Sequence, residues 1–498
     1  MFRSLMMLCY LVACGVMSVR VADAQDVWPG FRGRGDSQVP VIQAPAGQIP
    51  ANPEAGNRVS PNQVSPSKLP WAWEARGRSP GNWNIRLKGY GQSSPVVWGE
   101  TIYVTAISGE MKEHLHLFAI KLSDGELLWE REFSATQMVK ESDTVSRGAP
   151  TPVVDAKRVY AVFESGDVFA LDHAGELQWE RSFVKDYGEF KGPHGYASSP
   201  VLVDDLCIIQ VAQSGPSYIL ALDQATGLNR WKVDHPSQTG WSSPAIYRGE
   251  AGPQIIISTA GSVRALDAGS GATRWVSEEI QGNSTASPTI AGNLVVIGAA
   301  TERGGGGGGN RRAATPPTDA AASPASAAAT TTPQPSTTPE GSTPPGVERR
   351  AAPSAAPTGS GVLRLDGDAT REDRLVWKSP QVSAGYASPV VVGDFAYFVN
   401  RVGVATCARL SDGQVQWQHR LPGEVWASPV ANNGHVTFFG KFGFVVTLQG
   451  GPKVVEVAES NISTTEVVYG VAAAGNSWIV RTGRGLMRIS QPTEEAAN

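Results

Sequence analysis

Two histidines one residue apart, His114 and His116, are the first residues whose types and spacing suggest chemistry. In a β-strand, residues two positions apart point to the same face, so the two imidazoles would lie side by side, as metal ligands do. No third ligand stands near them in the sequence, and protein metal sites usually supply at least three. We therefore interpret the pair as exposed residues of a hairpin and predict no metal site.

Other catalytic signatures are weak. A row of aspartates recurs along the chain, but its members occupy the same place in similar segments, which predicts that they cap turns. These aspartates are Asp124, Asp172, Asp223, Asp267 and Asp412. The glycine run from Gly304 to Gly309 is too uniform, and too far from any helix start, to form a phosphate-binding loop.

The similar segments belong to an internal repeat. Each unit opens with Ser or Thr and Pro before a β-branched strand, and continues through an apolar strand and an Asp/Gly turn to a Trp. The openings are Ser94-Pro95, Thr151-Pro152, Ser199-Pro200, Ser243-Pro244, Ser287-Pro288, Ser388-Pro389 and Ser428-Pro429. A period of roughly 40 to 48 residues with four short strands is the size of a propeller blade. We expect the tryptophan of each fourth strand to pack one blade against the next.

The two ends of the chain complete the count of blades. Residues 83–87 resemble a fourth strand without the three strands that should precede it, and those three appear at 467–474, 478–482 and 486–489. Joining strands from both termini in one blade would remove an exposed sheet edge. The sequence therefore predicts an all-β, eight-bladed β-propeller of four-stranded blades, closed by an N-terminal strand in the C-terminal blade.

A tract within blade 5 does not resemble a blade. Residues 301–360 are rich in Gly, Ala, Pro and Thr, and such a composition cannot bury enough apolar surface to offset its ordering entropy. We predict a disordered insert there, with a tether or a lid as alternatives. We further expect an N-terminal extension at 25–67, the propeller at 68–490 and a short tail at 491–498.

The N-terminus resembles an export signal. Arg3 precedes an apolar run from Leu5 to Val19 and a cleavage site at 22–24, which predicts a signal peptide over 1–24. An alternative is a lipobox ending at Cys14, which would anchor the protein to the outer membrane by a lipid. We predict an exported, periplasmic or extracellular protein of bacterial origin, with no membrane-spanning helix in the mature chain.

Charge and cysteine content narrow the possible functional classes of the protein further. The formal net charge of -4 gives no basic footprint for nucleic acid. Outside the N-terminal segment, the cysteines are Cys207 and Cys407, both in apolar surroundings. We interpret them as buried thiols, with a disulfide between them as the alternative.

The blade motif A-L-D-x-x-(T/S)-G-x-x-x-W, as in residues 221–231, resembles the repeats of pyrroloquinoline-quinone (PQQ) propellers. The resemblance covers most of residues 83–489 apart from the insert. The same repeat occurs in quinoprotein alcohol dehydrogenases and in the propeller lipoprotein of the bacterial β-barrel assembly machinery. It is specific for the fold and says little about function.

The resemblance implies a test for enzyme function. Family quinoproteins hold PQQ and Ca²⁺ at the mouth of the channel beneath two adjacent cysteines, but this chain has no Cys-Cys pair and no C-x-x-C-H haem motif. No cofactor ligand of the family can be placed on particular residues here. We therefore lean against an enzyme, with PQQ and Ca²⁺ as the cofactors of the alternative, a PQQ-dependent oxidoreductase.

Two features predict where a ligand would bind. The connections at 133–148 and 183–195 are longer than their counterparts in other blades, and they contain Arg147 and His194. An aromatic residue also precedes the innermost strand of five blades. These residues are Tyr90, Tyr196, Trp241, Tyr386 and Trp426. They would form a partial ring at the channel mouth, or each would pack under its own loop.

Three functions follow from these observations. The first is a non-catalytic binding or scaffold module for an envelope protein, a peptide or a polysaccharide. The second is the PQQ-dependent oxidoreductase. The third is a factor in outer-membrane protein assembly, like the similar lipoprotein.

Overall fold

The computed structural model describes residues 27–39, 69–71, 73, 81–192, 194–236, 239–280, 285–299, 359–367 and 370–490. The predicted signal peptide, Cys14 and nearly all of the insert lie outside these residues. No described helix has the length and apolar character that crossing a membrane requires.

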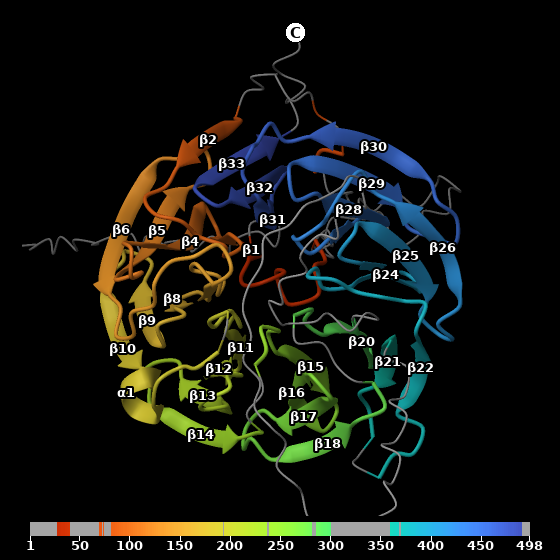
Figure 1. Ribbon diagram of the computed structural model, residues 1–498, viewed down its shortest axis with the longest axis horizontal. Helices are drawn as coiled ribbons and strands as arrows, with labels where there is room; N and C mark the ends of the chain where they lie inside the picture. Colours follow the sequence, from red (N-terminus) through yellow and green to blue (C-terminus); the bar gives the residue numbers. More distant parts are fainter. Residues whose placement is uncertain are drawn as a thin grey trace, which may run out of the picture. The chain divides into compact units, whose positions relative to one another are not determined.

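Eight antiparallel sheets follow one another around a ring (Figure 1). Each sheet has four strands, except that blade 1 gains a fifth, β1 (Val27–Trp28), on its innermost strand. The prediction of an all-β, eight-bladed propeller is confirmed.

The first four blades run in chain order from the innermost strand outward. Blade 1 contains β3 (Val96–Trp98), β4 (Thr101–Ser108), β5 (His114–Lys121) and β6 (Leu127–Ser134). Blade 2 contains β7 (Val153–Val154), β8 (Arg158–Val162), β9 (Asp167–Asp172) and β10 (Leu177–Ser182). Blade 3 contains β11 (Val201–Val203), β12 (Leu206–Val211), β13 (Tyr218–Asp223) and β14 (Asn229–Asp234). Blade 4 contains β15 (Ala245–Gly249), β16 (Gly252–Thr259), β17 (Ser262–Asp267) and β18 (Thr273–Ser277).

The remaining blades follow the same plan. Blade 5 contains β19 (Thr289–Ala291), β20 (Leu294–Ile297), β21 (Ser360–Arg364) and β22 (Leu375–Ser379). Blade 6 contains β23 (Val390–Val392), β24 (Phe395–Val399), β25 (Val404–Arg409) and β26 (Val415–Arg420). Blade 7 contains β27 (Val430–Asn432), β28 (His435–Phe439), β29 (Phe444–Gln449) and β30 (Glu456–Asn461). Helix α1 (Phe183–Tyr187) lies in the long connection after β10.

Blade 8 closes the ring with strands from both ends of the propeller. It contains β31 (Val468–Ala474), β32 (Ser477–Thr482), β33 (Gly485–Ser490) and β2 (Trp83–Arg86). Strand β2 pairs antiparallel with β33, from Trp83 opposite Arg488 to Arg86 opposite Gly485. The closure that the sequence predicts is therefore present.

The Ser/Thr-Pro openings form a ladder between neighbouring blades. In the first six repeats, the residue before the proline donates its backbone N–H to the hydroxyl of the corresponding residue in the next blade, over 2.8 to 3.1 Å. The ladder runs through Ser94, Thr151, Ser199, Ser243, Ser287, Ser388 and Ser428. Because these donors are buried, leaving one unpaired would be costly, which explains the hydroxyl at this position.

The repeated tryptophans connect the outer parts of the blades. Six indole N–H groups donate to a carbonyl oxygen in or beside the turn of the next blade, at 2.9 to 3.0 Å. A Cβ atom on Gly227 of that turn would lie 2.7 Å from the ring of Trp179, and its φ is +70°. The glycine of the motif is therefore required both by this close approach and by its backbone conformation.

The aspartates of the motif cap turns, as predicted. The Asp223 carboxylate, for example, accepts hydrogen bonds from the backbone N–H groups of Ala225 and Thr226 at 3.1 and 3.0 Å. These carboxylates therefore stabilise the hairpins and do not gather into one cluster.

The segment at residues 27–39, which we call the channel segment, lies at the centre of the ring (red in Figure 1). Val27 and Trp28 pair with Trp98 and Val97 of β3. Further along, Pro29 O accepts from Val154 N of blade 2, and Gln38 bridges to Ala431 of blade 7. The segment thus contacts blades 1, 2 and 7, although the sequence suggested only an extension there.

Arg32 holds the channel segment to blades 5 and 6. Its guanidinium donates to Thr289 Oγ1 and Pro389 O, both at 2.7 Å, and to Pro288 O at 3.2 Å. Burial lowers the pKa of Arg32 to about 10, so the side chain is still charged at neutral pH. The carbonyl and hydroxyl oxygens around it replace the water that it loses.

Cys207 and Cys407 are free and buried, in β12 of blade 3 and β25 of blade 6. The alternative of a disulfide between them is therefore wrong. Burial raises the pKa of both thiols to about 12, which makes them unreactive.

Candidate functional site: an aromatic arc beside a charged groove

Four aromatic side chains from consecutive blades form a continuous row, which we call the aromatic arc: Tyr386, Trp426, Tyr469 and Tyr90. The ring centroids of Tyr386 and Trp426 are 5.2 Å apart, and those of Trp426 and Tyr469 are 6.0 Å apart. Tyr90, Tyr386 and Trp426 stand shortly before the innermost strands of blades 1, 6 and 7, whereas Tyr469 lies within β31, the innermost strand of blade 8. The row therefore crosses four consecutive blades near their innermost strands.

Hydroxyl and cation contacts hold the arc. The Tyr90 and Tyr469 hydroxyls are hydrogen-bonded at 2.8 Å, and burial together with this bond raises the pKa of Tyr90. The Arg147 guanidinium lies 3.7 Å from the ring centre of Tyr90. Lys441 Nζ lies 4.4 Å from the ring centre of Trp426. Such pairs favour flat or partly charged ligands that can add to the stacks.

Exposure differs along the arc. Tyr386 is exposed, at 41%, and Tyr90, Trp426 and Tyr469 are partly buried. Arg401 covers the ring of Tyr386 at 5.0 Å and is itself exposed. The Tyr386 and Trp426 end of the arc is therefore the part open to a partner.

The other predicted residues make contacts of their own. Trp241 contacts His194, with ring centroids 5.7 Å apart, and its indole N–H donates to Gly195 O at 2.9 Å. Tyr196 is completely buried and packs against Phe190, so it lies under its own loop and outside any exposed row. The structure thus brings Tyr90, Arg147, Tyr386 and Trp426 into one row of contacts, while His194 and Trp241 contact each other beside the connection 133–148, where Ser146 N donates to His194 O at 2.9 Å.

Tyr469 was missed in the sequence. Blade 8 has no Ser-Pro at its opening, because Tyr469 is followed by Gly470, and a search guided by proline passes over it. A signal was nevertheless present, since Tyr469 is the aromatic residue of the predicted strand 467–474, which opens blade 8.

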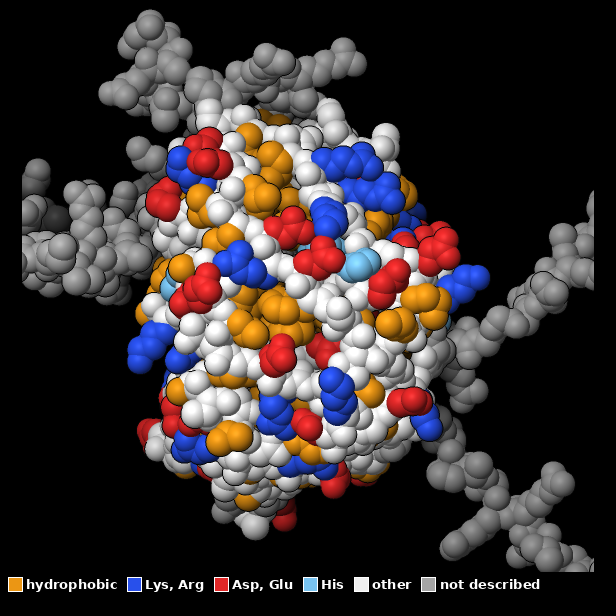
Figure 2. Space-filling model, turned by 90° about the vertical axis from the view of Figure 1, so that its left-hand side faces the viewer, with side chains coloured by type: hydrophobic (Ala, Val, Ile, Leu, Met, Phe, Trp, Pro, Cys, Tyr) orange, Lys and Arg blue, Asp and Glu red, His pale blue; other side chains and the backbone are white. Residues whose placement is uncertain are grey.

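A groove of about 400 Å³ opens beside Tyr90. It is lined by Arg86, Lys88 and Arg484 on the blade 8 side, with Glu141 of the long connection 133–148 also at its edge. On the side of the ring that carries β6 and β10, acidic and basic groups are interspersed, without a large area of one sign (Figure 2). The cationic groove is therefore a local feature.

A buried ion pair lies under the connection 133–148. Lys112 and Glu164 are 3.6 Å apart and nearly inaccessible, and Glu164 accepts from Gly148 N at 2.9 Å. Lys112 also donates to Ser146 O. Burial raises the pKa of Glu164 and lowers that of Lys112, while each partly opposes the shift of the other. The pair holds the backbone from which Arg147 reaches Tyr90.

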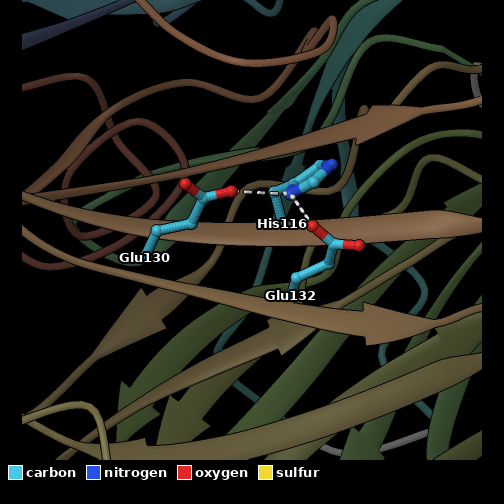
Figure 3. Close-up of side chains that lie close together, drawn as sticks. All are labelled: His116, Glu130 and Glu132. Atoms are coloured by element: carbon cyan, nitrogen blue, oxygen red, sulfur yellow. Dashed lines mark hydrogen bonds and ion pairs between the residues drawn. The ribbon is translucent and has the colours of Figure 1, made fainter.

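The sequence predicted that His114 and His116 form an exposed pair, and this prediction is wrong for His116. His116 is completely buried, whereas the side chain of His114 is 47% exposed. Glu130 and Glu132 of the neighbouring strand β6 point toward His116 (Figure 3). The antiparallel register places Glu132 directly opposite His116, which the sequence spacing of 16 residues concealed.

The fold family also includes quinoproteins, so we tested the channel for a fit to PQQ. The channel segment occupies the centre of the ring, and Arg32 fills the space between blades 5 and 6 with its guanidinium bonded to the protein. The two cysteines of the described chain lie in separate blades. These residues do not fit the quinone, and we derive no chemistry through it.

Comparison with known proteins agrees with this fold. The model of the family described as "Outer membrane protein assembly factor BamB" matches residues 81–218, 197–316 and 362–497. BamB of Salmonella typhimurium strain LT2 is 25% identical over 214 residues, which are 42% of this chain and 48% of that protein. BamB of Moranella endobia is 27% identical over 179 residues, which are 36% of this chain and 39% of that protein. The chain thus spans less than half of the length of these relatives.

Two solved structures show the same fold. BamB from Moraxella catarrhalis has a TM-score of 0.52 at 13% identity, covering 82% of this chain and 95% of that one. Quinohemoprotein alcohol dehydrogenase from Comamonas testosteroni has a TM-score of 0.56 at 12% identity, covering 94% of this chain and 80% of that one. At such identities the likeness concerns architecture alone, and it includes both an assembly factor and an enzyme.

The family model matches three segments that cover most of the propeller on either side of the insert. The family's description refers to the outer membrane, which agrees with the exported location predicted from the N-terminal segment. This chain belongs to the family of PQQ-like propellers described as outer membrane protein assembly factor BamB.

Proposed function

We propose that this chain is an exported, non-catalytic factor in outer-membrane protein assembly, which acts by binding a protein of the bacterial envelope. The observation that carries this proposal is the family match over both parts of the propeller. Among the three functions that the sequence suggested, the match favours the factor in outer-membrane protein assembly. It also specifies the process that a binding or scaffold module would serve.

The open end of the aromatic arc is our candidate for the partner-binding surface. Tyr386 and Trp426 are large, amphipathic and stiff, and such residues often dominate the energy of protein interfaces. Arg401 and Lys441 lie over their rings, and Lys441 pairs with Glu424 at 2.9 Å. A rim of charges around an aromatic centre matches the usual anatomy of a protein interface.

The channel segment supports a surface role for the propeller. A ligand that entered the channel would have to displace Arg32 and the pairing of β1 with β3. Binding residues of rigid scaffolds are otherwise commonly carried by loops, and Tyr386 and Trp426 stand in such connections.

The test is genetic complementation in the bacterium that encodes the protein. Deleting the gene should lower the amount of folded β-barrel proteins in the outer membrane, and the wild-type gene should restore it. The double variant Tyr386→Ala/Trp426→Ala should restore it poorly, while being exported at the wild-type level. Heat-modifiable mobility of the barrel proteins on gels provides the measurement.

A matched control separates the surface from general damage. Leu228→Ala also removes an exposed apolar side chain, 64% exposed, but in the outer turn of blade 3. It should complement fully. Normal levels of folded barrels after deletion of the gene would refute the function, whereas full complementation by the double variant would refute only the role of the arc.

A further inference from the structure

The cluster around His116 has no role in the proposed function, and it combines the ligand types that a transition metal prefers. It lies on strands β5 and β6 of blade 1, where Lys88 of the connection from blade 8 reaches it. Imidazole nitrogen and carboxylate oxygen are the donors of many zinc sites.

The distances between the donor atoms suit one ion. His116 Nδ1 is 3.0 Å from Glu130 Oε1 and 3.8 Å from Glu132 Oε2 (Figure 3). The ligand atoms of these three residues all lie within 4.8 Å of one another. Donors bound at about 2.0 Å to a tetrahedral zinc ion are about 3.3 Å apart, so only small rotations of the carboxylates are needed.

His114 can supply a fourth donor. Its Nδ1 lies 2.8 Å from Glu132 Oε1, and its ring centre is 6.5 Å from that of His116. It is exposed, so its side chain can turn toward an ion held by the other three residues. Two histidines and two carboxylates would make a mixed N/O site of four donors.

A partner outside the ligands orients His116. Its Nε2 lies 2.8 Å from Ser108 Oγ of β4, and the ring is completely buried. Without an ion, Nδ1 donates to Glu130 Oε1 and Nε2 accepts from the Ser108 hydroxyl; with an ion bound at Nδ1, Nε2 would donate its proton to Ser108 instead. Metal-binding histidines commonly have such a hydrogen-bond partner on the second nitrogen, and it fixes the tautomer.

The Lys88 ammonium already forms ion pairs with the carboxylates of this cluster. Its ammonium lies 2.6 Å from Glu132 Oε2 and 3.7 Å from Glu130 Oε1, and the side chain is 54% exposed. An exposed lysine can move into solvent at little cost, because its ion pairs there are weak. Lys88 therefore shows that the cluster attracts cations, and its ammonium competes with a metal ion for the same position.

From these contacts we propose that His114, His116, Glu130 and Glu132 bind one divalent transition-metal ion of the Zn²⁺ class, and that this ion displaces Lys88. The ion would join β5 to β6 at the seam between blades 8 and 1. It would also release Lys88, which stands two residues before Tyr90 of the aromatic arc.

The test uses the purified mature chain with Zn²⁺, by calorimetric titration, and with Co²⁺, whose visible spectrum reports the coordination geometry. One equivalent should bind. Glu130→Gln and Glu132→Gln should each weaken binding by at least 10-fold, and Ser108→Ala by about 10-fold, as for other partners of metal ligands. Lys88→Met should strengthen binding by about 10-fold, because it removes the competing cation.

Glu126→Gln is the matched control, since Glu126 is a 65% exposed carboxylate of the same blade that pairs with Lys121. It should bind Zn²⁺ as the wild type does. Thermal unfolding without metal verifies that every variant is folded. Unchanged affinity in both carboxylate variants would overturn the proposal, because the ion would then bind elsewhere.

The Lys88→Met variant makes a negative result decisive. If neither the wild type nor this variant bound Zn²⁺, the cluster would not be a metal site. Binding by the variant alone would also overturn the proposal, because Lys88 would then be the permanent occupant in the native chain.

Discussion

Lys112 and Glu164 show how a single pair of residues can support the loop that carries Arg147. Both side chains are withdrawn from water, and both bond to the backbone of residues 146–148. Breaking a buried pair usually destabilises a protein strongly, because one charge is left without a partner. The pair therefore ties the position of Arg147, and with it the Tyr90 end of the arc, to the stability of blades 1 and 2.

We predict that Lys112→Met lowers the free energy of unfolding by about 3 to 5 kcal/mol at neutral pH. Burial already raises the pKa of Glu164 above its ordinary 4.5, and removing Lys112 raises it further. A raised pKa means that stability is fully present below pH 4.5 and is lost as the pH rises through the folded value. The deficit of the variant should therefore shrink in acid and grow toward neutral pH.

Denaturant unfolding at a series of pH values measures this effect. The double variant Lys112→Met/Glu164→Gln is the control, since it removes the buried carboxylate as well and should recover most of the loss. A deficit in Lys112→Met that did not change with pH would contradict the role assigned to Glu164.

Among the elements, β1 is the least expected. It has only two residues, and short strands contribute little by themselves. What holds the channel segment is the sum of contacts around the ring: the pairing with β3, the Trp28 side chain in the core, and the bonds of Arg32 to blades 5 and 6. The segment acts as a central cross-brace between blades that are far apart along the ring.

This arrangement predicts a specific requirement for arginine at position 32. Arg32→Lys keeps the charge but loses the planar fork that bonds to Thr289, Pro389 and Ser37 together. We expect a loss of at least about 2 kcal/mol of stability, since hydrogen bonds to charged groups are each worth about 1.5 to 3 kcal/mol. Thermal unfolding provides the measurement.

Arg34→Lys is the control, because Arg34 is exposed in the same segment. It should unfold at the wild-type temperature. Equal unfolding temperatures for both variants would show that Arg32 does not brace the ring.

For the molecule as a whole, stability comes from a closed circle of similar contacts. The hydroxyl ladder, the tryptophans and the shared cores each join one blade to the next, and β2 completes the last blade. In repeat folds, the interfaces between neighbouring units carry much of the stability. A long insertion is tolerated where it leaves these interfaces intact.

We therefore predict that replacing residues 302–357 with a short Gly-Ser linker leaves the unfolding temperature unchanged or slightly raised. Blade 5 holds both ends of the insert by itself, since Ile297 pairs with Gly361 and Ala299 N donates to Ser360 Oγ at 2.9 Å. Each halving of a flexible loop gains only about 0.6 kcal/mol. A large fall in unfolding temperature would show that the insert contributes to the ring.

The sequence by itself determined the architecture. Each blade repeats the same local chemistry, so the number of blades, the turns capped by Asp223 and its counterparts, and the packing of the tryptophans could all be predicted. Ring closure could be predicted as well, because the unmatched strand at 83–86 and the three strands after residue 467 complete one unit.

Only the tertiary structure decided which side chains meet across strands and blades. The contact of His116 with Glu130 and Glu132 depends on the register of β5 and β6, and the contact of Trp426 with Tyr469 depends on the closed ring. Burial likewise separated Tyr196 from the exposed aromatic residues. The position of the channel segment gave no periodic signal, because its bonds run to residues as much as 394 positions away, as from Ser37 to Ala431. Local patterns specify repeated elements, whereas a site is made by residues that the folded chain brings together.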